Sequence, residues 1–121
     1  MAFIVKRDPN IPLSQANISL TGFSYTPQGN TNSPFNLIGV SITLPKQVGY
    51  DLQWYSAANV TGYEVLVYFT SGQWLILIYN NNLPQIETVA TNPAPNTSIP
   101  ATGWVLNAGA GNSGSVIITA A

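Results

Sequence analysis

The sequence contains no cysteine and no histidine. Without cysteine, the chain forms no disulfide and has no thiol nucleophile. Without histidine, it lacks the usual proton shuttle near neutral pH and can form no serine–histidine pair. A zinc site lacks its usual ligands, and four scattered acids do not make the oxygen cluster that calcium requires. We therefore predict no metal site, no cofactor and no catalytic residue.

One catalytic arrangement survives these absences: a carboxylate pair of the kind used in glycoside hydrolysis. Asp51 and Glu64 lie in or beside neighbouring predicted strands, so they can approach each other. No feature of the sequence brings them together, and each is more simply a solvent-facing or interface charge. We therefore expect that the protein is not an enzyme.

Charge is scarce throughout the chain. Charged side chains make up 6% of the residues, against about 25% in an ordinary soluble domain. The cations are Lys6, Arg7 and Lys46, too few for the basic patch that nucleic acid binding requires. Two long segments, 9–45 and 88–121, carry no charge at all. Such a surface has little electrostatic repulsion to keep copies of the protein apart.

The N-terminal sequence MAFIVKRDPN places a short apolar run before its cations, the reverse of a secretory signal. No apolar run approaches the ~20 residues of a transmembrane helix. We therefore expect no signal peptide, no membrane partner and synthesis in the cytoplasm. Pro9 and Pro12 favour an extended backbone and interrupt strand pairing. Residues 1–12 are thus predicted to form an extended arm, or an ordinary edge strand, ahead of a body over residues 13–121.

Segments rich in β-branched and aromatic residues recur along the chain, separated by clusters of Gly, Pro and Asn. No window shows the spacing of an amphipathic helix. Eight or nine short strands predict an all-β, single-domain antiparallel β-sandwich of the immunoglobulin-like, jelly-roll or β-tulip type. The expected strands cover residues 2–6, 17–24, 36–44, 50–56, 63–69, 74–79, 85–91, 103–107 and 115–120.

Two loops are long and rich in Pro and Asn, at residues 26–34 and 91–102. Loops of this length often make functional contacts. The simpler interpretation is a crossover between two sheets, as Greek-key topologies require.

The stretch from Gly62 to Tyr79 predicts a hairpin that is apolar on both faces. Its turn is Thr70-Ser71-Gly72-Gln73. An antiparallel sandwich strand normally has one polar face. The second face is therefore covered either by another part of the chain or by another subunit, and the sequence leaves both possibilities open.

Aromatic residues suggest one binding chemistry. Trp54, Trp74 and Trp104, together with tyrosines such as Tyr50 and Tyr55, can form a platform on which neutral sugar rings stack. The competing interpretation places most of these rings in the core, where their burial contributes strongly to stability. A neutral-glycan-binding module is thus an alternative function.

The chain resembles the small structural proteins of tailed bacteriophages. It shares with them a small size, many strands, no cysteine, little charge and an extended segment, here MAFIVKRDPNIP. Among these, the chain is most similar to capsid decoration, or cement, proteins. The resemblance implies a β-sandwich or β-tulip body on the outer capsid surface of the virion. It also implies dimers or trimers that clamp neighbouring major capsid subunits, with no catalytic residue to transfer.

On this resemblance we expect a non-enzymatic virion protein whose partners are the major capsid protein and copies of itself. Phe3, Ile4 and Val5 are the expected contacts of the arm. The residues expected at a subunit seam are Tyr68, Trp74, Tyr79 and Trp104. A tail, fibre or filament subunit is a further alternative, and it differs from a cement protein by polymerising alone.

Overall fold

The structure is a computed structural model that describes residues 17–28, 34–47, 52–56, 62–80, 85–107 and 112–121. These residues contain no helix, and hence no helix able to cross a membrane. The strands are β1 (Ile18–Tyr25), β2 (Phe35–Asn36), β3 (Ser41–Leu44), β4 (Gln53–Ser56), β5 (Tyr63–Thr70), β6 (Gln73–Asn80), β7 (Gln85–Asn92), β8 (Val105–Leu106) and β9 (Ser113–Ala120).

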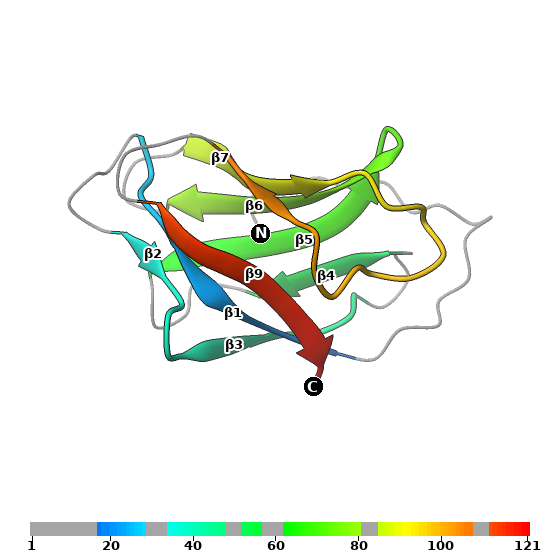
Figure 1. The fold of residues 1–121 in the computed structure, drawn as a ribbon, viewed down its shortest axis with the longest axis horizontal. Coiled ribbons are helices and arrows are strands. Elements are labelled where there is room, and N and C mark those ends of the chain that lie inside the picture. Colours follow the sequence, from blue (N-terminus) through cyan, green and yellow to red (C-terminus); the bar gives the residue numbers. More distant parts are fainter. Residues whose placement is uncertain (1–16, 29–33, 48–51, 57–61, 81–84, 108–111) are drawn as a thin grey trace.

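The strands form two antiparallel sheets, which confirms the predicted all-β sandwich (Figure 1). In the four-stranded sheet, β1 pairs with β2 and β3 along one edge and with β9 along the other. The five-stranded sheet has the order β4-β5-β6-β7-β8. The expected strand over residues 2–6 and the arm over residues 1–12 lie outside the described residues.

The predicted hairpin is present as β5 and β6. Thr70 pairs with Gln73, so Ser71 and Gly72 form a two-residue turn. Both turn residues have positive φ, at 51° and 82°, which is the backbone of a type I′ turn. Residues alternate between the two faces of the hairpin: Val65, Val67 and their partners on β6 face the core, whereas Leu66 and Leu77 face outward.

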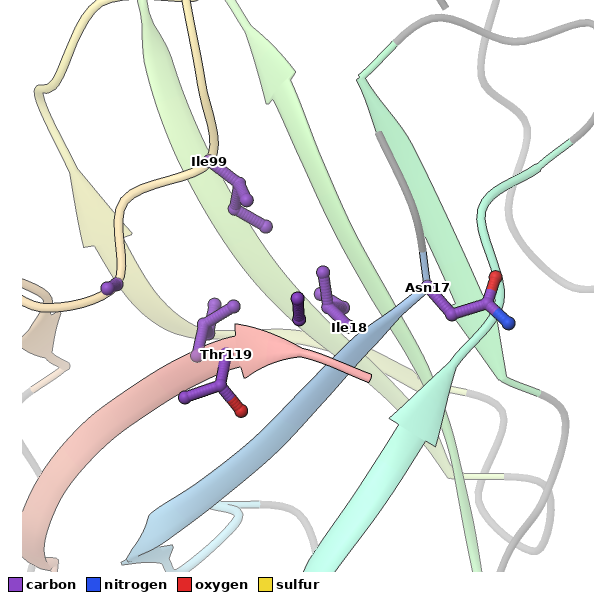
Figure 2. A pocket seen from close by; sticks show the side chains of 7 residues that line it. Asn17, Ile18, Ile99 and Thr119 are labelled. Atoms are coloured by element: carbon purple, nitrogen blue, oxygen red, sulfur yellow. The ribbon is translucent and has the colours of Figure 1, made fainter. Parts of the chain in front are cut away.

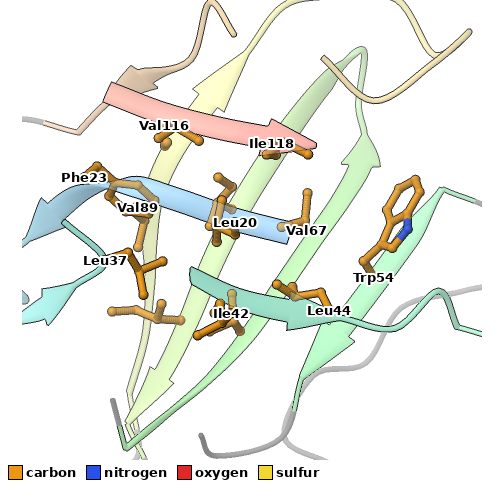
Figure 3. Close-up of a cluster of buried hydrophobic side chains, with 14 of the residues drawn as sticks. Leu20, Phe23, Leu37, Ile42, Leu44, Trp54, Val67, Val89, Val116 and Ile118 are labelled. Atoms are coloured by element: carbon orange, nitrogen blue, oxygen red, sulfur yellow. The ribbon is translucent and has the colours of Figure 1, made fainter. Parts of the chain in front are cut away.

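Side chains from both sheets meet in one apolar core (Figure 3). β1 contributes Leu20 and Phe23, and β9 contributes Val116 and Ile118. Period-two alternation explains this selection, because every second residue of a strand points to the same face. At the core's centre Phe35 contacts the rings of Phe23 and Tyr63 edge-to-face, with centroids 5.7 and 5.9 Å away.

The interpretation of the two long loops as crossovers is wrong. The segment between β1 and β2 connects strands of the same sheet, and so does the segment between β7 and β8. The chain changes sheet instead between β3 and β4 and between β8 and β9. The loop after β7 nonetheless reaches the other sheet, because the backbone N–H of Ile118 donates to the carbonyl of Ala101 at 3.0 Å.

Candidate protein-binding surface

The outward face of the four-stranded sheet presents hydroxyl groups and a few apolar side chains. Ser19 lies between Thr43 of β3 and Thr119 of β9, and Thr21 lies between Ser41 and Ile117. Strand registers place these side chains in rows across the sheet. A neutral face of this kind requires little desolvation of charge when it is covered by a partner.

Three large apolar side chains are exposed at one end of this sheet: Ile38, Val40 and Ile117, at 51%, 50% and 41%. Val40 directly precedes Ser41, which pairs with Thr21, and Thr21 also pairs with Ile117. The hydroxyl of Thr21 lies within hydrogen-bond distance of the backbone carbonyls of Leu37 and Val40 and can donate its one proton to either, which ties the β2–β3 turn to this position. We call Ile38, Val40 and Ile117 the apolar patch.

Charge is nearly absent from the described surface. Lys6, Arg7, Asp8 and Asp51 lie outside the described residues. Of the remaining charged residues, Glu64 is buried, and Lys46 and Glu87 are half-buried. No charged side chain is fully exposed in the part of the chain that the structure describes. That composition is typical of the core of a protein–protein interface, which is depleted in charge.

Two of the tryptophans expected at a seam or platform lie in the core. Trp54 and Trp74 are completely buried, with ring centroids 5.9 Å apart. Trp104 is half-buried and packs against the core, and its indole N–H donates to the carbonyl of Pro100 at 2.9 Å. Trp74 therefore has no surface to offer a partner, and the stacking platform expected for sugars loses Trp54 and Trp74.

The other expected contacts divide in two groups. Tyr68 and Tyr79 are half-buried on the outward face of β5 and β6. Burial raises the pKa of Tyr68. Phe3, Ile4 and Val5 lie outside the described residues. The carboxylate pair also remains open, because Asp51 lies outside them as well, and no cluster of metal-binding side chains occurs among the residues described.

The residues of the apolar patch do not stand out in the sequence. Ile117 lies within SVIITA, where three consecutive residues are apolar and the outward one cannot be recognised by polarity. Alternation is a usable signal once the flanking residues are known to be buried: Val116 and Ile118 point inward, so Ile117 points outward.

A hollow of about 390 Å³ lies between the start of β1, the end of β9 and the loop that follows β7 (Figure 2). Its lining is mainly apolar, with Ile18, Ile99 and Ile118 among the contributing residues. None of the described residues that line it is titratable. The described lining can accept an apolar group but contains no acidic or basic side chain.

One polar contact joins the two sheets at the end of β1. The hydroxyl of Tyr25 and the backbone N–H of Gln28 each donate to Oε1 of Glu87 on β7, both at 2.9 Å. Burial, the hydrogen bond to Glu87 and the charge of Glu87 together raise the pKa of Tyr25 from 10.0 to about 12. Burial and the corresponding interaction with Glu64 raise the pKa of Tyr55 to about 12.

These two tyrosines predict a loss of stability in alkali. Because their folded-state pKa is raised, their contribution is fully present below pH 10 and is lost as the pH rises through 10 towards 12. Spectrophotometric titration should show Tyr25 and Tyr55 ionising after the ordinary tyrosines. Tyr25→Phe should remove one late-titrating group and cost about 1 to 2 kcal/mol at neutral pH, because Glu87 loses a donor. A titration in which all tyrosines ionise near pH 10 would contradict this assignment.

No family model matches the chain, and neither a curated protein nor a solved structure matches it.

Proposed function

We propose that this β-sandwich is a non-enzymatic structural protein of a virion, a decoration or cement protein that binds neighbouring major capsid subunits on the outer shell. In this proposal its partners are the capsid protein and copies of itself, as a dimer or trimer. The observation that carries the proposal is the absence of a fully exposed charged side chain from the described surface.

The physical reason is the cost of desolvation. Covering a charge removes its hydration, and the pairing that repays this cost must be well formed. A surface of hydroxyl, amide and apolar groups avoids the cost, and its attraction is little affected by salt. Burying apolar area at each contact contributes roughly 25 cal/mol per Å² to the binding free energy, before the costs of association are subtracted. Many such contacts around a shell strengthen the overall binding through multivalency.

The apolar patch is the surface to which we assign shell binding. Its side chains are exposed on a sandwich that has a separate core of buried residues, so we assign their burial to a partner. The glycan-binding alternative has less support, because Trp54 and Trp74 are buried in the core.

Cosedimentation with shells assembled from the major capsid protein of the same source tests the proposal. The wild-type protein should sediment with the shells at both low and high salt. Ile117→Lys should weaken binding at least about tenfold, because it places a charge within the patch. Ile86→Lys is the matched control: Ile86 is 50% exposed, compared with 41% for Ile117, but it lies on β7 of the other sheet. Failure of the wild-type protein to sediment with the shells would overturn the function, and equal effects of the two variants would overturn the surface assignment.

A further inference from the structure

The hollow at the end of the sandwich combines a buried apolar lining with an exposed, uncharged rim. Ile18 of β1 and Ile118 of β9 are 3% and 2% exposed, and Ile99 points towards Ile18 from the loop that follows β7 (Figure 2). We call Ile18, Ile99 and Ile118 the isoleucine lining. The other described residues around the hollow are exposed and uncharged: Asn17, Ala101, Thr119 and Ala120.

The loop over the hollow is held to both sheets, so the hollow is formed before any occupant enters. Before Ile99, the indole N–H of the fully buried Trp74 on β6 donates to the carbonyl of Pro95 at 3.1 Å. After Ile99, the carbonyl of Ala101 accepts the backbone N–H of Ile118 on β9 at 3.0 Å. These bonds fix the loop on either side of Ile99. A site that is already formed loses little binding free energy to its own ordering.

Water is a poor occupant of this hollow. Oδ1 of Asn17 already accepts the backbone N–H of Lys46 at 3.0 Å, and the carbonyl of Asn17 accepts that of Ala121 at 2.8 Å. The carbonyl of Ala101 is engaged by Ile118. An enclosed water typically makes about three hydrogen bonds, which a mainly apolar lining with engaged polar atoms supplies badly. Replacing such water with an apolar group against the isoleucine lining is favourable.

We propose that the hollow binds a small, neutral, mainly apolar molecule. The volume of the hollow is about 390 Å³. An apolar cavity of ~150 Å³ is large enough to hold benzene, so this hollow has room for roughly ten to fifteen non-hydrogen atoms.

Charge complementarity restricts the ligand to neutral molecules. None of the described lining residues is titratable. A charged ligand would lose hydration on entry without gaining an ion pair from these residues. An acid or an amine should therefore bind more weakly than an alcohol of the same chain length.

This inference goes beyond the proposed function and does not rest on it. The hollow lies where Ile18 of β1 pairs with Ala120 of β9, whereas the apolar patch lies where Thr21 pairs with Ile117. The two positions are three residues apart along each strand, or about 10 Å. Ligand binding is measured on the protein alone, so its failure leaves the cosedimentation result unaffected.

Titration of octan-1-ol into the full-length protein, labelled with ¹³C at the isoleucine δ1 methyl groups, tests the inference by nuclear magnetic resonance. The signals of Ile18, Ile99 and Ile118 should shift saturably, with half-saturation at about 1 mM or below. The signals of Ile42 in the core and Ile86 on the exposed surface are internal controls and should stay in place. Octanoate and octylammonium should bind at least about tenfold more weakly. Absence of saturable shifts in the isoleucine lining, equal shifts at Ile86, or equal binding of the three probes would overturn the inference.

Ala101→Trp is the second test, because the larger side chain occupies the hollow from its rim. It should weaken the binding of octan-1-ol at least about tenfold. Thr97→Trp is the matched control and should leave binding unchanged, since Thr97 is exposed in the same loop and is not among the described lining residues. Unchanged binding by Ala101→Trp would contradict the site. If octan-1-ol fails to bind the wild-type protein while Ala101→Trp loses cosedimentation with shells, the hollow holds a side chain of the capsid partner, and the inference is wrong.

Discussion

Gly22→Ala should lower the free energy of unfolding by about 3 to 5 kcal/mol, a large part of the stability of a domain this size. Gly22 lies at a bulge in β1, where the pairing with β9 shifts register between Thr21 and Phe23. Its φ is +96°, and a Cβ atom there would come within 2.4 Å of the backbone oxygen of Ser115. The strain of a positive φ in alanine and the collision of its Cβ with the backbone both destabilise the variant. Urea denaturation followed by tryptophan fluorescence measures the loss.

Gly72→Ala separates the two causes. Gly72 also has a positive φ, +82°, but no atom lies within 4 Å of the position of its Cβ. We expect a cost of about 1 kcal/mol from the left-handed backbone alone. Gly114, opposite the bulge, should behave like Gly22, because its Cβ would lie 2.2 Å from the oxygen of Gly22. Equal losses for Gly22→Ala and Gly72→Ala would show that the close approach of the two strands is unimportant.

The sequence predicted the sandwich and most strands because alternation and turn residues are local signals. The hairpin of β5 and β6 shows this best, since Ser71 and Gly72 form the turn that the sequence suggests. The expected strand over residues 36–44 is divided instead. The side chain of Asn36 accepts the N–H of Ile38, and Gly39 has a φ of +76°, so the chain turns there. Asn side chains compete with strand pairing through such local bonds.

Connections between the sheets could not be predicted, because strand order depends on contacts far apart in the sequence. Long loops suggested crossovers, yet the loop after β7 returns to its own sheet. Asn92 organises this loop: its amide donates to the carbonyl of Thr102, and its oxygen accepts the N–H of Ala94. An abundance of Asn therefore serves the loop backbone here, a role that composition alone does not reveal.

Only the general character of the candidate surface could be predicted from the sequence. The scarcity of charge correctly indicated a neutral surface in the described residues, and the double-sided hairpin correctly indicated a covered outer face. The individual contact residues were harder to predict, because β5 and β6 are apolar on both faces and polarity does not identify which face packs against the core. Leu66 and Trp74 are both fully buried, but they lie on opposite faces of the same sheet.

Trp74→Ala should cost about 3 to 5 kcal/mol, the usual range for removing a buried tryptophan. The ring of Trp74 lies 5.4 Å from that of Phe69 and 5.9 Å from that of Trp54, and its N–H donates to the carbonyl of Pro95 at 3.1 Å. The change therefore leaves a cavity and also releases the loop after β7.

Trp104→Ala is the matched control for Trp74→Ala, and calorimetry of both variants checks the pair. Trp104 is half-buried, so we expect a cost of about 1 to 2 kcal/mol, with the hydrogen bond to Pro100 lost as well. Equal costs would contradict the placement of Trp74 in the core. A Trp74→Ala variant that stays folded and loses only shell binding would also contradict this placement, because Trp74 would then lie at the surface seam expected from the sequence. If the placement is right, any loss of shell binding by Trp74→Ala should track the unfolded fraction, whereas the loss caused by Ile117→Lys should occur in a fully folded protein.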